Sequence, residues 1–326
     1  MKTVTLGLLG FGTVGGGAYE ALKMTEEQFT KKLGIKLEVK KILVNTLKKK
    51  RREDIDPSVF TTNAKDIIAD PDIDIVAEAM GGIEPATAYM LEAMRYGKHV
   101  VTANKAAVAH NYEILTKTAD RYGVFFRMEA CVAGGIPILN AITQVLQANK
   151  FEEVLGILNG TTNYILTQMT QFGLPYEEVL KDAQEKGFAE ADPTDDVEGI
   201  DVANKLSILM ALSFGKYVHP TKIPREGITG VTMEDIEKAK AEGKTIKLIA
   251  SAVDNNGELE YSVKPIALPN EHPLASVSNE YNAVFIKGNA VGELMFQGKG
   301  AGALPTGSAF GGDILNIMAL SGGKIL

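Results

Sequence analysis

The sequence predicts an α/β protein with two domains, a parallel α/β domain followed by an α+β domain. Three observations favour this class. Short apolar runs of strand length alternate with helical stretches in the first part of the chain, a pattern typical of parallel sheets. After Pro137 helical stretches dominate, and strand-like runs appear from Lys244 onward. The chain of 326 residues also has about twice the length of an ordinary domain.

The first part of the chain is expected to alternate regularly between strands and helices. Strands are expected at 4–9, 36–44, 74–79, 99–102 and 124–128. Helices are expected from Ala18 onward and over 86–95 and 112–122. Helices of this length are the usual crossovers between parallel strands, so these elements should form one sheet.

The second part of the chain has a different pattern of expected helices and strands. Helices are expected at 139–148, 161–172, 176–186 and 197–214, and strands at 246–253, 259–265, 283–287 and 292–297. A final helix is expected after the Gly- and Pro-rich stretch 298–307. We therefore place a first domain at 1–138, completed by 300–326, and a second domain at 139–299.

Composition excludes several classes of protein. With 45% hydrophobic and 23% charged residues, the chain has ample material for a core and is not a disordered protein. The net charge of -7 argues against a nucleic-acid binder. One cysteine excludes an internal disulfide, and the four histidines lack metal-binding spacing. The amino terminus lacks signal-peptide features, so we expect a soluble, cytoplasmic protein without a membrane anchor.

A glycine loop follows the first expected strand. Its sequence is Gly10-Phe11-Gly12-Thr13-Val14-Gly15, and a helix is expected directly after it. In this context the glycines allow a tight turn and close approach of a pyrophosphate, and the helix N-terminus favours its charge. The loop predicts a Rossmann-type dinucleotide site with cofactor contacts at Gly10, Gly12, Thr13, Val14 and Gly15. The alternative is an ordinary strand-to-helix turn.

The end of the second expected strand bears on the choice of cofactor. An NAD site usually has an acidic residue there for the ribose hydroxyl, whereas this chain has Asn45 and then five consecutive cations at 48–52. Such a run suits the 2′-phosphate of NADP, although a solvated basic loop is the alternative. We expect NADP, with NAD possible.

Acidic residues and a lysine gather in the second domain. Four carboxylates lie within 190–196, and Asp201 and Lys205 are one helical turn apart. The following residues are apolar on nearly every face, which favours a buried lysine with a useful pKa over an exposed ion pair. Lys105 follows a strand and is expected near the nicotinamide, or else on the surface. Cys131 is expected to be a small buried residue.

Several motifs together resemble homoserine dehydrogenase over nearly the whole chain. The most specific are the run Asn-Gly-Thr-Thr-Asn-Tyr at 159–164 and the segment 188–205 with Ala-Asp-Pro-Thr-Asp-Asp-Val-Glu-Gly-Ile-Asp. The others are the glycine loop, Ala-Asn-Lys at 103–105, the segment 129–137, Gly-Ala-Gly at 300–302 and Pro-Thr-Gly at 305–307.

The resemblance implies NAD(P)-dependent interconversion of L-homoserine and L-aspartate 4-semialdehyde, in threonine and methionine biosynthesis. It implies that Lys205 transfers the proton at the substrate oxygen, that Asp201 places Lys205, and that Lys105 neighbours substrate and nicotinamide. The implied substrate contacts are Glu190 and Asp196, at the ammonium group, with Gly160 and Thr161. The implied cofactor contacts include Gly81, Lys105 and Gly302 besides the glycine loop.

The resemblance also implies a sodium ion and an oligomer. The ion would be bound by Glu129 and the carbonyl oxygens of Val132, Gly134 and Ile136, because hard cations prefer oxygen ligands. The second domain is expected to make a homo-oligomer, a dimer or tetramer.

Three departures from the family pattern stand out. Phe188 replaces a frequent Tyr and Asn45 a frequent Arg. The sequence also leaves no room for a C-terminal regulatory ACT domain, so threonine feedback through one is not expected.

Two other functions compete with this reading. One is a semialdehyde dehydrogenase that uses Cys131 as a nucleophile. The other is an NADP-binding sensor without activity, for which a buried charged pair would be a costly feature.

Overall fold

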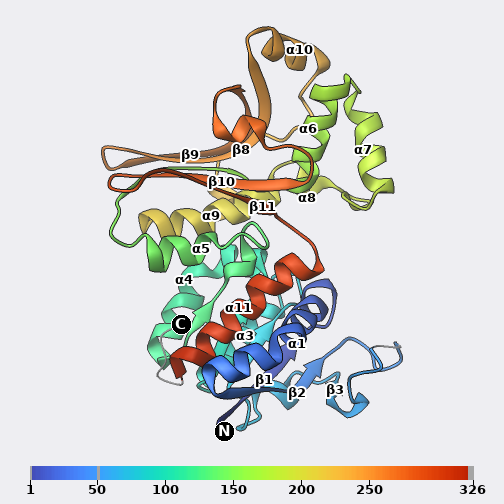
Figure 1. Cartoon of the computed structure of the whole chain (residues 1–326), viewed down its shortest axis with the longest axis vertical. Helices are drawn as coiled ribbons and strands as arrows, with labels where there is room; N and C mark the ends of the chain where they lie inside the picture. Colours follow the sequence, from blue (N-terminus) through green and yellow to red (C-terminus); the bar gives the residue numbers. More distant parts are fainter. Residues whose placement is uncertain (1, 50–51, 322–326) are drawn as a thin grey trace. The chain divides into compact units, whose positions relative to one another are not determined.

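The computed structural model describes residues 2–49 and 52–321 and divides the chain into two compact units. The first unit comprises Met1–Gly134 and Gly302–Leu326, and the second comprises Gly135–Ala301. Figure 1 shows that the last helix of the chain returns to the first unit, beside the first helix.

A parallel sheet of six strands forms the centre of the first unit. Its strands are β1 (Lys2–Leu9), β2 (Ile35–Leu43), β3 (Phe60–Thr61), β4 (Ile75–Glu78), β5 (His99–Thr102) and β6 (Phe126–Arg127). They lie in the order β3-β2-β1-β4-β5-β6, and each neighbouring pair is parallel. This is the strand order of dinucleotide-binding Rossmann folds, so the predicted fold class is confirmed.

Helices cover this sheet. They are α1 (Thr13–Leu33), α2 (Lys65–Ile68), α3 (Ala86–Arg95), α4 (Lys105–Tyr122) and α11 (Ala303–Ser321), with short 3-10 turns η1 (Pro57–Val59) and η2 (Glu129–Cys131). The helix expected at 112–122 is the second part of α4, which follows a kink at Asn111 (φ -127°). A first part, not expected, begins at Lys105, where the Asn104 side chain caps the helix. Between α1 and α11 the backbones nearly touch: a Cβ on Gly307 would lie 2.4 Å from the carbonyl carbon of Gly17.

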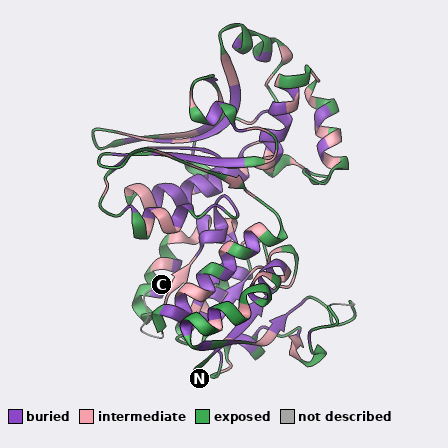
Figure 2. Ribbon diagram, viewed as in Figure 1, coloured by how far each residue is buried: buried purple, intermediate pink, exposed green. Residues whose placement is uncertain are grey.

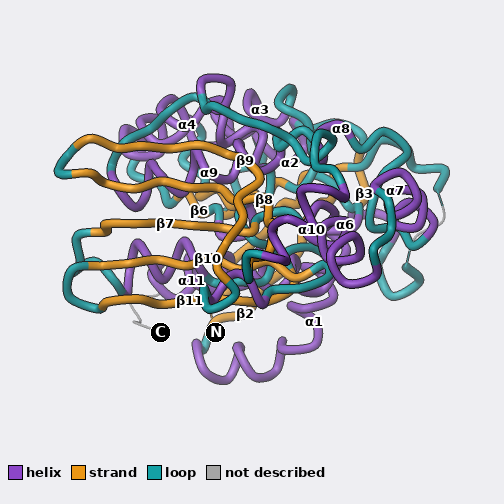
Figure 3. The backbone as a smooth tube through the Cα atoms, turned by 90° about the horizontal axis from the view of Figure 1, so that it is seen from above, coloured by secondary structure: helices purple, strands orange, loops and turns teal. Residues whose placement is uncertain are grey.

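An antiparallel sheet of five strands forms the centre of the second unit. Its strands are β7 (Phe151–Ile157), β8 (Lys244–Asn255), β9 (Glu258–Pro269), β10 (Tyr281–Gly288) and β11 (Gly292–Lys299). They lie in the order β11-β10-β7-β8-β9, as Figure 3 shows from above. The central strand β7 was not predicted, because Glu152 and Glu153 interrupt its apolar pattern.

The helices of the second unit are mostly those expected. They are α5 (Ile138–Asn140), the π-helical turn η3 (Ala141–Val145), α6 (Gly160–Phe172), α7 (Tyr176–Glu185), α8 (Thr194–Val197), α9 (Ile200–Phe214), η4 (Pro220–Lys222), α10 (Met233–Ala241) and η5 (Pro273–Ser276). In Figure 1, α9 lies along one side of the sheet and α10 on the other. The helix expected at 139–148 is a short helix with a π turn instead, and α10 was not expected.

The first three turns of α9 form the longest buried helical segment among the described residues of the second unit (Figure 2). Its residues 201–211 are all buried, including Asp201 and Lys205. Among the described residues, no helix is long and apolar enough to cross a membrane.

Candidate active site

Asp201 and Lys205 form a buried ion pair on α9. The Lys205 Nζ lies 2.6 Å from Asp201 Oδ2, and the two residues are 7% and 6% exposed. The same ammonium group donates a hydrogen bond to the main-chain oxygen of Leu158 at 2.5 Å. An exposed pair would contribute little, whereas this one is held in a single geometry inside the protein.

Asn159 connects this pair to a second carboxylate. Its side-chain oxygen caps α6 by accepting from the Thr162 N–H at 2.9 Å, so its NH2 group must face the other way. That group donates to Asp196 Oδ1 at 2.6 Å and to Asp201 Oδ2 at 3.0 Å. The start of α6 thus brings Asp196, from α8, to the ion pair of α9.

The Asp196 carboxylate also lies beside Thr161. The Thr161 hydroxyl lies 3.1 Å from Asp196 Oδ2 and 2.6 Å from the main-chain oxygen of Phe188, and either oxygen can accept its one hydrogen. Burial raises the pKa of Asp196, and the nearby charge of Asp201 raises it further, while the hydrogen bonds from Asn159 and Thr161 oppose the rise. A cation beside this carboxylate would stabilise its ionised form.

Gly160 belongs to this cluster of polar residues, whereas Glu190 lies at the surface. A Cβ on Gly160 would lie 2.8 Å from the Glu280 main-chain oxygen, so only glycine fits at the start of α6. Glu190 is exposed. The structure therefore brings together Gly160, Thr161, Asp196, Asp201 and Lys205, while Glu190 lies at the surface.

The glycine loop forms an open turn at the carboxyl end of β1. Gly10 has a φ of +99°, and a Cβ there would lie 2.6 Å from the Ala79 main-chain oxygen. A Cβ on Gly15 would lie 2.3 Å from the Gly10 oxygen, but one on Gly12 would meet nothing within 4 Å. Gly12 precedes α1, whose first residues are Thr13 and Val14 and whose N-terminus has no side-chain cap. The loop can therefore receive a pyrophosphate.

The ends of β4 and β5 form the neighbouring part of this edge. Gly81 has a φ of +82° and follows β4, and Lys105 is the first residue of α4 after β5. Gly302, with a φ of +118°, leads into α11, where its oxygen accepts from the Thr306 N–H at 3.1 Å. These three predicted cofactor residues all belong to the first unit.

The basic run is only partly available to a ligand. Residues 50 and 51 lie outside the described residues, while Lys48 and Lys49 are exposed. Arg52 contacts two carboxylates, Asp54 at 2.9 Å and Glu20 at 3.3 Å, and its guanidinium carbon lies 5.6 Å from the ring centre of Tyr19. Arg52 is therefore engaged by its own chain.

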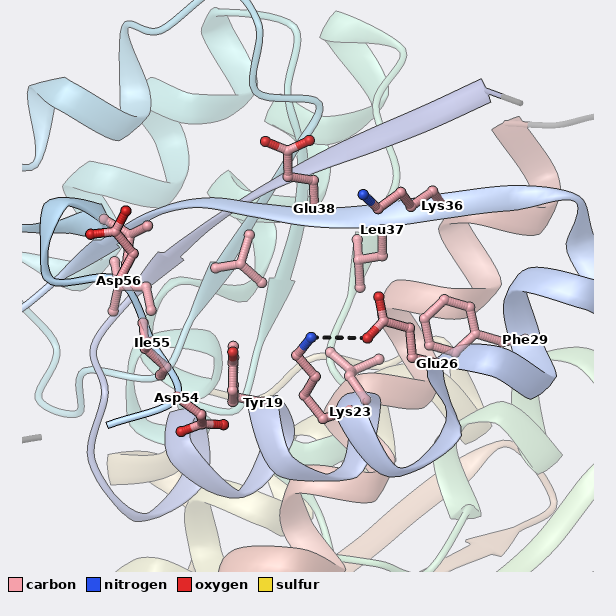
Figure 4. A pocket seen from close by; sticks show the side chains of 14 residues that line it. Tyr19, Lys23, Glu26, Phe29, Lys36, Leu37, Glu38, Asp54, Ile55 and Asp56 are labelled. Atoms are coloured by element: carbon pink, nitrogen blue, oxygen red, sulfur yellow. Dashed lines mark hydrogen bonds and ion pairs between the residues drawn. The ribbon is translucent and has the colours of Figure 1, made fainter. Parts of the chain in front are cut away.

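A cavity of about 240 Å³ lies between α1, β2 and the segment 54–59 (Figure 4). Its lining includes Phe29 near the end of α1 and Lys36 near the start of β2, with Lys23 and Glu26 paired at 2.9 Å. The lining extends along α1 from Tyr19 to Phe29 and along β2 from Lys36 to Ile42. None of the predicted cofactor residues lines this cavity.

The proposed cation ligands are divided between the units. Glu129, 3% exposed, and Val132 and Gly134 belong to the first unit, and Ile136 belongs to the second. Ala133 and Gly134 have φ values of 56° and 57°, so the chain turns sharply here. Within the described residues, no group of three or more His, Cys, Asp or Glu could hold a metal ion.

Cys131 is a poor nucleophile. It is 1% exposed, and burial together with the charges of Glu78 and Asp313 raises the pKa of its thiol well above the usual range. Its sulfur lies 3.4 Å from the Thr102 main-chain oxygen. The structure therefore disfavours chemistry through a Cys131 thiolate.

Two buried polar residues near α6 were not predicted from the sequence. Lys247, 2% exposed, donates to Asn163 Oδ1 at 3.0 Å and to the Val277 oxygen at 2.5 Å. The Asn163 NH2 group lies within 3.2 Å of the main-chain oxygens of Val277, Asn279 and Tyr281. The one available signal was a lysine inside the apolar strand pattern of β8.

Comparison with known proteins gives consistent matches. Two family models match, "Homoserine dehydrogenase, NAD binding domain" over residues 10–129 and "Homoserine dehydrogenase" over 137–315. The homoserine dehydrogenase of Bacillus subtilis is 45% identical over 98% of this chain and 73% of its own length. A crystal structure of the Thiobacillus denitrificans enzyme matches with a TM-score of 0.94 and 42% identity, covering 98% of this chain and 74% of that one. A hyperthermophilic archaeal homoserine dehydrogenase in complex with NADPH matches with a TM-score of 0.81 and 26% identity, over 96% and 97% of the two chains.

Proposed function

The chain belongs to the homoserine dehydrogenase family of NAD(P)-dependent oxidoreductases, and we propose how its own residues interconvert L-homoserine and L-aspartate 4-semialdehyde. This reaction serves threonine and methionine biosynthesis. The observation that carries the proposal is the buried Lys205–Asp201 pair, joined through Asn159 to Asp196.

Lys205 is the proton-transfer group. Oxidation of the alcohol to an aldehyde requires the loss of a hydroxyl proton, and the reverse reduction requires its return. In the reduction the Lys205 ammonium group gives a proton to the aldehyde oxygen, and in the oxidation the neutral Lys205 amine takes the proton from the hydroxyl group. Asp201 and the Leu158 oxygen fix the position of that amine by hydrogen bonds. Hydride transfer is the chemistry that the nicotinamide cofactor supplies when bound, and it needs positioning above all.

Asp196 holds the ammonium group of the amino-acid substrate. Asp196 is half-buried, and its raised pKa means that an adjacent cation would stabilise its ionised form. Gly160 and Thr161 line the same site. Glu190 would join them from the surface when substrate binds.

The cofactor is held by the first unit. The glycine loop residues Gly10, Gly12, Thr13, Val14 and Gly15 accommodate the pyrophosphate, and the open space at Gly12 supports this fit. Gly81, Gly302 and Lys105 would make further contacts to the cofactor, with Lys105 beside the nicotinamide. NADP is the preferred form, since no acidic residue follows β2 and the exposed Lys48 and Lys49 suit a 2′-phosphate.

A sodium ion and a second subunit complete the proposed enzyme. The Glu129 carboxylate and the carbonyls of Val132, Gly134 and Ile136 would supply oxygen ligands for the ion. Exposed apolar side chains in the second unit, among them Val145 at 78% and Phe172 at 65%, support a homodimer formed through that unit. The cytoplasm is its proposed location.

Initial rates test the proposal. The wild-type protein should oxidise L-homoserine with NADP+ faster than with NAD+, and Lys205→Ala should lower kcat by at least about 100-fold. Lys216→Ala, which changes an exposed lysine just beyond α9, is the matched control and should keep wild-type rates. Absence of turnover in folded wild-type protein would overturn the proposed function, and an active Lys205→Ala variant would overturn the role of Lys205.

A further inference from the structure

A buried carboxylate lies at the carboxyl end of β4 and was not singled out from the sequence. Glu78 is the last residue of β4 and is 0% exposed. Its Oε1 accepts from the Met80 N–H at 2.7 Å, and its Oε2 accepts from the Thr102 hydroxyl at 2.6 Å. The Asn104 NH2 group lies 3.4 Å from Oε1. This one side chain thus joins the ends of β4 and β5 to the start of α4.

The direction of these hydrogen bonds indicates an ionised carboxylate. Asn104 Oδ1 accepts from the Ala107 N–H at 3.1 Å, so its NH2 group faces Glu78 and the Gly82 oxygen. The Thr102 hydroxyl oxygen accepts from the Asn104 N–H at 3.0 Å, so its own hydrogen is directed at Glu78. All these partners donate, and a carboxylate that only accepts is the ionised form.

Burying the ionised Glu78 carboxylate costs free energy. Burial raises the pKa of Glu78, while the hydrogen bonds from Thr102 and Met80 oppose the rise. Met80, Thr102 and Asn104 are neutral, so they solvate the negative charge without cancelling it. A buried charge of this kind is stabilised most by a nearby cation.

The location of Glu78 at the carboxyl end of β4 relates its negative charge to the cofactor site. In sheets of this strand order, dinucleotides bind beyond the carboxyl ends of the strands, and the two halves of the sheet take the two nucleosides. The glycine loop follows β1, next to β2, so the half that contains β4 and β5 is left for the nicotinamide. The oxidised nicotinamide ring carries a positive charge and the reduced ring carries none.

We propose that Glu78 is the buried counter-charge of the oxidised nicotinamide, so that it strengthens binding of NADP+ relative to NADPH. The proposal rests on the proposed function to the extent that the first unit binds a nicotinamide dinucleotide. Its consequence is a shift of the redox equilibrium of the bound cofactor toward the oxidised form. Glu78 also ties the Gly81–Gly82 turn to α4, but that structural role would affect both forms of the cofactor alike.

Binding measured without substrate separates charge from structure. The dissociation constant for NADPH is measured from its fluorescence, and that for NADP+ from competition against NADPH, in wild-type protein and in Glu78→Gln. Glu78→Gln keeps the shape of the side chain and removes its charge. The expected result is a dissociation constant for NADP+ raised roughly tenfold, with that for NADPH changed less than about threefold. Glu113→Gln, which removes an exposed charge from α4, should leave both constants at wild-type values.

Each outcome decides the inference. Equal weakening of both forms, or no change, in Glu78→Gln would overturn it. If Glu78→Gln fails to fold, Glu78→Asp serves instead: it keeps the charge, and it should keep the NADP+ to NADPH affinity ratio, whereas a tenfold loss of that ratio would overturn the proposal. Failure of wild-type protein to bind either form would defeat the assignment of the cofactor site itself, which distinguishes the two claims.

Discussion

Lys247 makes the stability of the second unit depend on pH in an unusual direction. Its ammonium group is buried with two neutral acceptors, Asn163 Oδ1 and the Val277 oxygen. Burial lowers the pKa of Lys247 from 10.5 to about 8. Between these values the unfolded chain binds more protons than the folded chain, so the stability contribution of this residue rises with pH.

The size of the effect follows from the two pKa values. Below pH 8 the lysine is charged in both states, and the full cost of burying the charge is present. Above pH 10.5 it is neutral in both states, and the cost is gone. The difference between a pKa of about 8 and one of 10.5 corresponds to about 3 kcal/mol in the free energy of unfolding.

Urea denaturation at a series of pH values from 7 to 10.5 measures this contribution. The free energy of unfolding of wild-type protein, taken relative to Lys247→Met, should rise by about 3 kcal/mol over the range, since other ionisations are common to both proteins. Lys264→Met, which changes an exposed lysine on β9, should run parallel to wild type. Parallel curves for wild type and Lys247→Met would refute the reasoning. Lys247→Gln, which keeps a hydrogen-bond donor for Asn163, serves if the methionine variant does not fold.

Two further predictions concern the proposed sites. Asp196→Asn should raise KM for L-homoserine about tenfold or more, because the ammonium group loses its carboxylate. In wild-type protein KM should rise as the pH falls through the raised pKa of Asp196, and in the variant KM should not depend on pH in this range. A pH-independent wild-type KM would count against that role. Gly12→Val should abolish measurable NADPH binding while leaving the thermal unfolding midpoint nearly unchanged, because a Cβ there meets nothing within 4 Å. Wild-type NADPH affinity in this variant would show that the pyrophosphate does not approach Gly12.

Some features could be read from local sequence because they depend on short-range spacing. The alternation of apolar runs and helical stretches determined the fold class, which the strand order confirms. The glycine loop lies between a strand and a helix, where its spacing is typical of a dinucleotide site. Asp201 and Lys205 are four residues apart, so any helix through them places both on one face. The apolar residues that follow them indicated that this face is buried.

Other features depend on contacts between distant parts of the chain, and only the tertiary structure decided them. Asn159 joins Asp196 and Asp201 across about 40 residues of sequence. Lys247 of β8 meets Asn163 of α6, and Glu78 of β4 meets Thr102 of the adjacent strand β5. The local sequence shows only that such a polar residue lies within an apolar run. Which partner stabilises it there depends on how sheet and helices pack, and no spacing in the sequence records that.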